Sequence, residues 1–194
     1  DGAWGWSTTN SPTHAGQHGE PVPSRRADDA ERVALGRTMA EFNRGIVEID
    51  SAAVAALVAD RRVLVTGAGG SIGSELVRQL STLAPASLIA LDRDDSLLHA
   101  VIATLEPQHR KVCTPVLADI RDVDRLDDVF DHHRPQLVFH AAALKHVPAL
   151  EGAPSEGWKT NVLGSANVVN VSERHGVERV VNISTDKAAN PANV

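Results

Sequence analysis

Five short apolar runs, separated by amphipathic segments, follow one another in regular order from residue 61 onward. The runs cover residues 61–67, 87–92, 111–119, 136–143 and 179–184, and the segments with helical spacing cover 71–83, 95–106, 123–133 and about 155–175. Continuously apolar runs are typical of strands covered on both faces, and strands that alternate with helices form parallel sheets with right-handed crossovers. The sequence therefore predicts an α/β protein with a Rossmann-like three-layer fold and a parallel sheet of order 3-2-1-4-5, incomplete at the C-terminus.

The chain divides into three predicted parts. Residues 1–27 are rich in Gly, Pro, Ser, Thr and His without periodicity, so we expect a flexible tail or linker. Residues 28–60 contain two segments with helical spacing and are predicted to form a helical lead-in. Residues 61–194 form the predicted nucleotide-binding domain. Its first helix, at 71–83, places Ile72, Leu76 and Leu80 on one apolar stripe.

Composition excludes several classes of function. The 194 residues include 19 basic and 25 acidic side chains, and the net charge of −6 gives no support to nonspecific nucleic-acid binding. No apolar stretch approaches the roughly 18 residues of a membrane span, so we expect this chain to make no membrane contact. The single cysteine, Cys113, fits a reducing cytoplasm and is predicted to be a buried thiol. His14 and His18 lie in Gly- and Pro-rich sequence, so no metal site is predicted.

Gly67, Gly70 and Gly73 form the pattern GxxGxxG within VLVTGAGGSIGSEL, between a predicted strand and a predicted helix. Glycine lets the backbone turn tightly and approach a ligand with no Cβ in between. The helix begins near Ser71 and Ile72, and its free N–H groups and positive dipole end suit a pyrophosphate. These residues together predict a dinucleotide-binding loop.

An acidic residue, Asp92, ends the second strand at the distance expected after such a loop. Its carboxylate can bind the adenosine ribose hydroxyls and repels a 2′-phosphate, which favours NAD. Arg93 follows immediately and can pair with a 2′-phosphate, so NADP is the alternative cofactor. Asp119, at the end of the third strand, is predicted to meet the adenine amino group, and Ile120 to pack on the ring. The alternative is an acidic cluster at a helix N-terminus, where Asp122 is predicted to be a cap.

Six motifs occur in order: TGAGGSIGSEL, LDRDDSLLH, ADIRD, VFHAAALKHVPALE, NVLGSANV and NISTDKAANPANV. Together they resemble the CapD-like polysaccharide biosynthesis proteins, which are nucleotide-sugar 4,6-dehydratases of the extended short-chain dehydrogenase/reductase superfamily. The resemblance covers about residues 44–194. It implies a longer parent protein that is homo-oligomeric and anchored at the cytoplasmic face of the inner membrane.

The resemblance implies a UDP-N-acetylhexosamine substrate, typically UDP-N-acetylglucosamine, in cell-surface polysaccharide or glycan biosynthesis. In this family NAD(P)⁺ takes a hydride from C4 of the sugar, the ketone acidifies the C5 proton, water leaves from C6, and the hydride returns to C6. The same scaffold supports epimerisation at C4 or C5, so a UDP-sugar epimerase is one alternative. A non-catalytic dinucleotide-binding module is another.

The family's active-site residues map onto the end of this chain. The resemblance implies that Thr185 orients the sugar, that Asp186 protonates the departing C6 hydroxyl and that Lys187 removes the C5 proton. An adjacent carboxyl and ammonium group in a closed site can have pKa values suited to acid–base work. A solvated turn is the alternative for these three residues.

Further residues are implied on the cofactor and substrate sides of the site. Ala141, Ala142 and Ala143 are small where the strand end must pass close to the cofactor, while Lys145 and His146 are expected near the substrate mouth or on the surface. Asn161 resembles the superfamily's structural asparagine and is a further substrate-side candidate, with a solvent-facing helix residue as the alternative.

Enzymes of this superfamily use Tyr-x-x-x-Lys to take the C4 hydroxyl proton, and some CapD-like members replace the tyrosine with methionine. This chain contains no tyrosine, and its only methionine is Met39. We therefore expect the catalytic helix to follow Val194 and the 194-residue chain to be a truncated nucleotide-binding part without turnover.

Overall fold

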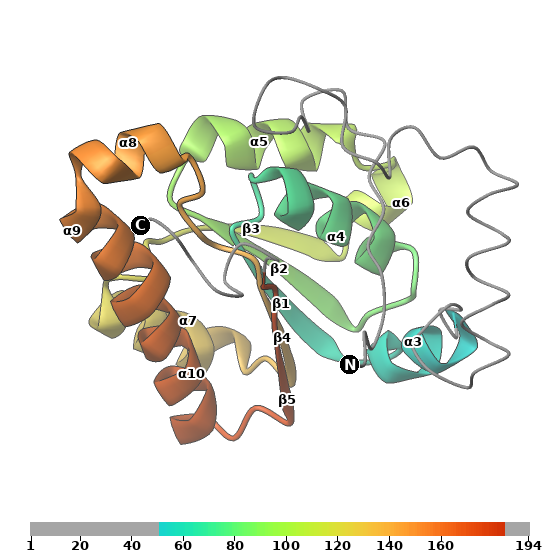
Figure 1. Cartoon of the computed structure of the whole chain (residues 1–194). Coiled ribbons are helices and arrows are strands. Elements are labelled where there is room, and N and C mark those ends of the chain that lie inside the picture. The colour runs from blue at the N-terminus through green and yellow to red at the C-terminus, as the bar shows by residue number, and fades with distance from the viewer. Residues whose placement is uncertain (1–50, 185–194) are drawn as a thin grey trace, which may run out of the picture. The chain divides into compact units, whose positions relative to one another are not determined.

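The computed structural model describes residues 51–184, and its centre is one parallel sheet. The strands are β1 (Arg62–Thr66), β2 (Ser87–Asp92), β3 (Cys113–Leu117), β4 (Leu137–His140) and β5 (Arg179–Asn182). They lie in the order β3-β2-β1-β4-β5 (Figure 1), and all four neighbouring pairs are parallel. The predicted fold class and strand order are therefore confirmed.

Helices connect these strands in the described range. They are α3 (Ser51–Val58), α4 (Ser71–Ser81), α5 (Asp95–Thr104), α6 (Pro107–Arg110), α7 (Val123–His133), α8 (Val147–Gly152), α9 (Pro154–Gly157), the π-helix η1 (Trp158–Gly164) and α10 (Ser165–Arg174). Helix α7 has the predicted bounds, because the Asp122 side chain accepts a hydrogen bond from the Arg125 N–H at 3.0 Å. Asp122 is thus the predicted N-cap.

Alternate residues of the central strands enter two separate cores, because successive side chains of a strand point to opposite faces. Val63 and Val65 of β1 pack in the core that α3, α4 and α5 share, whereas Leu64 packs in the core with Phe130 of α7 and Val168 of α10. Figure 1 shows α4 and α5 on one face of the sheet and α7 and α10 on the other. The three predicted layers follow from this division.

The prediction of an apolar stripe on α4 is wrong for one residue, Ile72. Ile72 is 55% exposed, and the buried face of the helix instead carries Gly73, Val77 and Leu80. A Cβ added at Gly73 would lie 1.9 Å from the Gly67 carbonyl oxygen. This close packing of the first turn on the glycine loop sets which face of α4 meets the sheet.

The expectation that every strand is covered on both faces fails at β3. Thr114, Pro115 and Leu117 are exposed, because β3 lies at the edge of the sheet. Proline lacks the N–H needed in a central strand and is tolerated at an edge. Cys113 of the same strand is buried, which raises the pKa of its thiol to about 11.

The single long helix predicted at about 155–175 is three consecutive segments. Helix α9 leads into the seven-residue π-helix η1 and then into α10. A π-helix has a wider turn than an α-helix and is frequent at functional sites. Helix α8, just before these segments, was not predicted. No helix within residues 51–184 is long and apolar enough to span a bilayer.

The fully buried Phe130 ring should contribute strongly to stability. We expect Phe130→Ala to lower the free energy of unfolding by about 3–5 kcal/mol, because it removes apolar contacts and leaves a cavity. Urea unfolding measures this loss. Val169→Ala is the control, because Val169 is 48% exposed on α10 and its truncation should change stability by less than about 0.5 kcal/mol. Equal losses in the two variants would contradict the described core.

Candidate nucleotide-binding site

The loops that follow β1, β2, β3 and β4 meet at the carboxyl edge of the sheet. Because the strands are parallel, their carboxyl ends lie together, and ligands of open α/β sheets bind at such an edge. The strand order reverses direction between β1 and β4, so the loop after β1 faces the segment after β4.

The loop after β1 requires glycine at its first position. Gly67 has φ +67°, and a Cβ added there would lie 2.6 Å from both the Cα and the N of Ala142. The Gly70 N–H closes the turn on the Gly67 carbonyl at 3.0 Å, and the Ala141 N–H donates to the Thr66 carbonyl at 3.1 Å. The structure thus brings the predicted small residues of the β4 exit against the predicted phosphate loop. Ala141 and Ala142 are half-buried there, and Ala143 is exposed.

The N-terminus of α4 opens onto the same edge. Its N-cap residue, Gly70, provides no side-chain hydrogen bond to the helix. The unpaired N–H groups of the first turn and the helix dipole favour an anion at this position. Lys145, from the segment after β4, adds a positive charge, since its Nζ donates to the Ser71 Oγ at 3.2 Å. The exposed Ile72 lies in the same turn.

Asp92 connects this loop to the end of β2. Its Oδ2 accepts a hydrogen bond from the Gly69 N–H at 2.8 Å, and its Oδ1 accepts one from the Asp94 N–H at 3.0 Å. The carboxylate is therefore held by two backbone amides, between the glycine loop and the pocket at the ends of β2 and β3.

That pocket is open and has a volume of about 540 Å³. It is lined by Arg93, Asp94, Asp95, Leu117, Ala118, Asp119 and Arg121. Its lining carries charges of both signs beside apolar surface, which suits a planar ring with polar edges.

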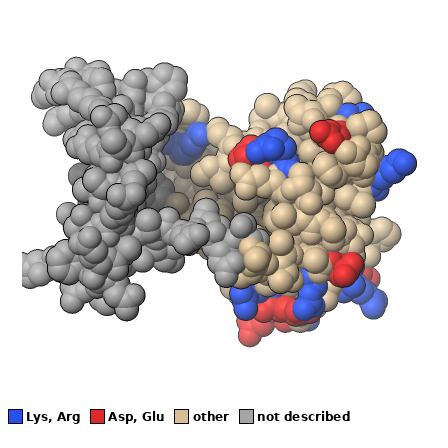
Figure 2. Space-filling model, turned by 90° about the vertical axis from the view of Figure 1, so that its right-hand side faces the viewer, with Lys and Arg blue, Asp and Glu red and all other residues tan. Residues whose placement is uncertain are grey.

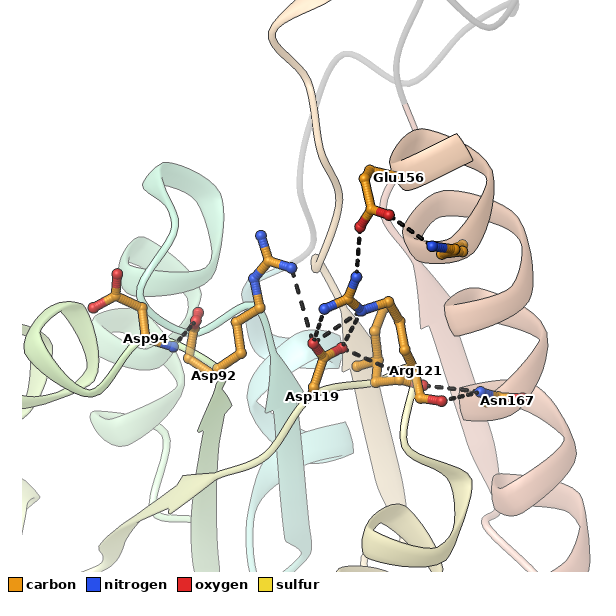
Figure 3. A network of polar contacts seen from close by, with 9 residues as sticks. Asp92, Asp94, Asp119, Arg121, Glu156 and Asn167 are labelled. Atoms are coloured by element: carbon orange, nitrogen blue, oxygen red, sulfur yellow. Dashed lines mark hydrogen bonds and ion pairs between the residues drawn. The ribbon is translucent and has the colours of Figure 1, made fainter. Parts of the chain in front are cut away.

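Asp119 is held in the pocket wall by arginine (Figure 3). Arg121 donates to Asp119 with an Nη2–Oδ2 distance of 2.6 Å, and its Nη1 reaches Glu156 of α9 at 2.9 Å. Burial alone would raise the pKa of Asp119, but the hydrogen bonds from Arg121 and the charges of Arg121 and Arg93 outweigh it and lower the pKa. Asp119 is therefore a carboxylate at neutral pH.

Ile120 lies beneath this wall rather than at its surface. Its side chain is 3% exposed and packs on Gly164, where an added Cβ would lie 2.7 Å from the Ile120 Cδ1. Asn167 of α10 also donates to the Ile120 carbonyl at 3.1 Å, which ties the β3 exit to that helix (Figure 3). The contacts of Asp119 and Ile120 with an adenine ring stay predictions.

Asn161 lies at the centre of η1 and binds the segment after β4. Its Oδ1 accepts from the Leu144 N–H at 2.8 Å, and its Nδ2 donates to the Leu144 carbonyl at 2.9 Å. The Asn161 side chain thus holds the backbone of Leu144 in place, which the alternative of a purely solvent-facing residue did not include. The neighbouring His146 is exposed and precedes α8 without capping it through its side chain. Substrate contacts of Asn161, Lys145 and His146 stay predictions.

His140 is a site residue that the sequence patterns did not single out. Its ring is 2% exposed, with Nδ1 2.6 Å from the Thr66 Oγ1 and Nε2 2.8 Å from the Ser165 Oγ. Burial lowers the pKa of His140. A polar residue that interrupts the apolar end of the strand, in LVFHAAA, was the one available signal.

The predicted acid–base residues Thr185, Asp186 and Lys187 lie outside the described residues. Strand β5 ends at Asn182, and the Ile183 N–H still donates to the His140 carbonyl at 2.9 Å. The chain therefore leaves β5 at the edge that carries the glycine loop.

Figure 2 shows acidic and basic side chains interspersed in small groups on one face.

Alanine should destabilise the fold more at Gly67 than at Gly176, a second glycine with a similar positive φ. Gly176 has φ +66° with no atom within 4 Å of an added Cβ. In both alanine variants the left-handed conformation should lower the free energy of unfolding by about 1–2 kcal/mol. In Gly67→Ala the overlap with Ala142 should lower the free energy of unfolding by about 1–3 kcal/mol more. Thermal unfolding compares the two, and equal losses would contradict the close approach.

The low pKa of His140 should make stability depend on pH. The folded chain holds His140 neutral, whereas the unfolded chain binds a proton near the ordinary pKa of 6.5. The unfolded state then binds more protons, so this contribution to stability is complete above pH 6.5 and is lost as pH falls through the lowered folded pKa.

His140→Gln should flatten this slope in urea unfolding between pH 7 and pH 5. A smaller slope should remain, because burial also lowers the pKa of His133. His99→Gln is the control, because His99 is exposed. An unchanged slope in His140→Gln would contradict a neutral buried ring.

Residues 63–194 match the family described as "Polysaccharide biosynthesis protein". The chain is 40% identical over 155 residues to the capsular polysaccharide biosynthesis protein CapD of Staphylococcus aureus, covering 79% of this chain and 26% of that protein. It is 33% identical over 135 residues to a UDP-N-acetylglucosamine 4,6-dehydratase (inverting) of Campylobacter jejuni, covering 69% of this chain and 39% of that protein. The chain thus spans less than half the length of these relatives.

Among solved structures, the chain is similar to a UDP-glucose-4-epimerase from Stenotrophomonas maltophila with bound NAD and formylated UDP-arabinopyranose. The TM-score is 0.58 at 27% identity, over 66% of this chain and 38% of that one. The resemblance predicted from the six motifs is confirmed, and the chain belongs to the polysaccharide biosynthesis protein family.

Proposed function

We propose that residues 61–184 bind NAD and that a protein carrying this chain is a UDP-N-acetylhexosamine 4,6-dehydratase, of the UDP-N-acetylglucosamine type, in cell-surface polysaccharide biosynthesis. One observation carries the cofactor part of the proposal: Asp92 accepts from the Gly69 amide at 2.8 Å, so the glycine loop and the ribose-type carboxylate share one edge of the sheet. The Campylobacter jejuni relative bears the name of this dehydratase, and the chain covers 39% of it.

The residues present fit a dinucleotide. A Cβ at Gly67 or Gly73 would fill the turn, and the start of α4 has no side-chain cap. These features favour a pyrophosphate at the α4 N-terminus, with ribose at Asp92 and adenine in the pocket beyond it. When bound, the nicotinamide supplies a hydride acceptor that later returns the hydride to the sugar.

NAD fits this edge better than NADP. A 2′-phosphate would face the Asp92 carboxylate, and Asp94 and Asp95 also line the pocket. The candidate counter-charge, Arg93, lies 3.9 Å from the Asp119 carboxylate, which already offsets part of its charge. We therefore propose NAD as the cofactor.

The chain's own residues supply the acid–base steps of the proposed reaction. Thr185 orients the sugar, Lys187 removes the C5 proton once C4 is a ketone, and Asp186 protonates the departing C6 hydroxyl. Lys145 and His146, in the segment after β4, are further candidates for contact with the sugar nucleotide. Attachment of the parent to the cytoplasmic face of a membrane and a homo-oligomeric state stay predictions from the family resemblance.

A UDP-sugar epimerase is the second candidate. A solved UDP-glucose-4-epimerase with bound NAD shares this fold at 27% identity. Both reactions begin with a C4 ketone, so the two functions differ only in the steps after oxidation at C4. Incubation of a protein carrying this chain with UDP-N-acetylglucosamine, with NMR of the product, separates a 4-keto-6-deoxy sugar from an epimer.

We expect the 194-residue chain to bind the cofactor without turnover, because it contains no tyrosine to accept the C4 hydroxyl proton and its only methionine, Met39, precedes the glycine loop. NMR of a UDP-N-acetylglucosamine solution containing the purified chain and NAD should show no new sugar signals. A measurable rate of dehydration would show that another residue of this chain accepts that proton.

Calorimetric titration with NAD and with NADP tests the cofactor proposal. We expect NAD to bind at least about tenfold more tightly, a difference of about 1.4 kcal/mol in binding free energy. Asp92→Asn should narrow this preference, because it removes the charge that faces the 2′ position. Asp131→Asn is the matched control, because Asp131 is exposed near the end of α7 and does not line the pocket. Tighter binding of NADP to the unsubstituted chain would overturn the choice of NAD.

A further inference from the structure

A chain of hydrogen bonds passes through the buried His140 and joins the two sides of the candidate site. On one side its Nδ1 lies 2.6 Å from the Oγ1 of Thr66, the last residue of β1 before the glycine loop. On the other side its Nε2 lies 2.8 Å from the Oγ of Ser165, the first residue of α10. Both side-chain partners are hydroxyls, so neither one carries a negative charge that would stabilise a protonated ring.

The partners of Ser165 identify the tautomer of His140. The Ser165 hydroxyl donates its single proton to the Asn161 carbonyl at 2.9 Å. It can therefore only accept from His140, which requires a proton on Nε2. In the neutral ring Nδ1 is then unprotonated and accepts from the Thr66 hydroxyl. Burial, which disfavours the charged ring, supports the neutral state.

The bonds continue from Ser165 to the segment after β4. Ser165 fixes the Asn161 carbonyl within the π-helix, and the Asn161 side chain holds both backbone groups of Leu144, at 2.8 and 2.9 Å. The next residue, Lys145, reaches the Ser71 hydroxyl at the start of α4. The chain of bonds thus begins at Thr66 and returns at Ser71, the two residues that bracket the glycine loop.

We propose that His140, as its neutral Nε2-protonated tautomer, is a positioning residue that acts through Ser165 and Asn161 to hold Leu144 and Lys145 over the phosphate loop. Its effect on the cofactor rests on the proposed function, whereas the tautomer and the hold on Leu144 do not. The ring touches no reacting atom. It sets where the Lys145 ammonium lies relative to the anion-binding end of α4.

The tautomer is tested directly by long-range ¹H–¹⁵N NMR of the 194-residue chain labelled with ¹⁵N-histidine. The chain has nine histidines, so the ring of His140 is identified by the signals that vanish in His140→Gln. At pH 7 we expect that ring to have a protonated Nε2 and an unprotonated Nδ1. A ring protonated on Nδ1, or on both nitrogens, would overturn the proposal.

The positioning role is tested by two matched serine variants of α10. Ser165 and Ser172 each donate to the carbonyl four residues earlier, at 2.9 and 2.7 Å, but only Ser165 contacts His140. In Ser165→Ala we expect hydrogen exchange of the Leu144 amide to be at least about tenfold faster, whereas Ser172→Ala should leave it unchanged. Equal exchange in the two variants would overturn the proposal.

Binding of NAD and of adenosine to the same variants distinguishes an effect on the proposed phosphate contacts from an effect on the proposed adenosine contacts. Ser165→Ala should weaken NAD binding about tenfold while leaving adenosine binding unchanged, because adenosine carries no phosphate for Lys145 to meet. Equal weakening of both ligands would indicate a general loss of structure and would overturn the positioning role. If the unsubstituted chain bound neither ligand, the proposed function would fail, while Leu144 exchange would still decide whether His140 positions the segment.

Substitutions of His140 itself give a further test by partial rescue. Glutamine can place an N–H near the Nε2 position and keep the bond to Ser165, whereas asparagine reaches only the Nδ1 position. We therefore expect slower Leu144 exchange in His140→Gln than in His140→Asn. The opposite order would mean that the Thr66 side of the ring holds the segment, which contradicts the proposal.

Discussion

The approach of Gly67 to Ala142 is the contact on which the rest of the site depends. A Cβ on Gly67 would lie 2.6 Å from the Ala142 backbone, so the glycine loop and the β4 exit can touch only without a side chain there. This contact lies between β1 and β4, where the strand order reverses. It brings the α4 N-terminus beside a segment that carries its own lysine, and the anion-binding end of the site results from that proximity.

The same strands that form the apolar cores place polar groups at their ends. Leu64 and Val138 point into the core beneath α7 and α10, and two residues further along each strand, on the same face, stand Thr66 and His140. The side chains therefore change from apolar to polar along one face without any change in direction. Because both ring nitrogens of His140 contact hydroxyls, the polar groups are satisfied without introducing a buried charge.

The two carboxylates at the ends of β2 and β3 are held by different kinds of partner. Asp92 is held by two backbone amides, while Asp119 is held by Arg121, which also binds Glu156. Arg121 thus connects the pocket wall to the helical segments that carry Asn161. The pocket wall at the end of β3 and the segment after β4 consequently share one set of supporting helices, although β3 and β4 lie on opposite sides of β1.

The sequence alone determined the parallel sheet, its strand order, the glycine loop and the Asp122 cap, because hydrophobic period, glycine spacing and capping residues are local signals. Only the tertiary structure decided the rest. The rotation of α4 depends on Gly73 packing against Gly67, and the exposure of β3 depends on its place at the edge. The hold of η1 on the segment after β4 depends on the hydrogen bonds between Asn161 and Leu144. His140 gained its role from Ser165, a partner 25 residues away, and no local pattern encodes such a contact.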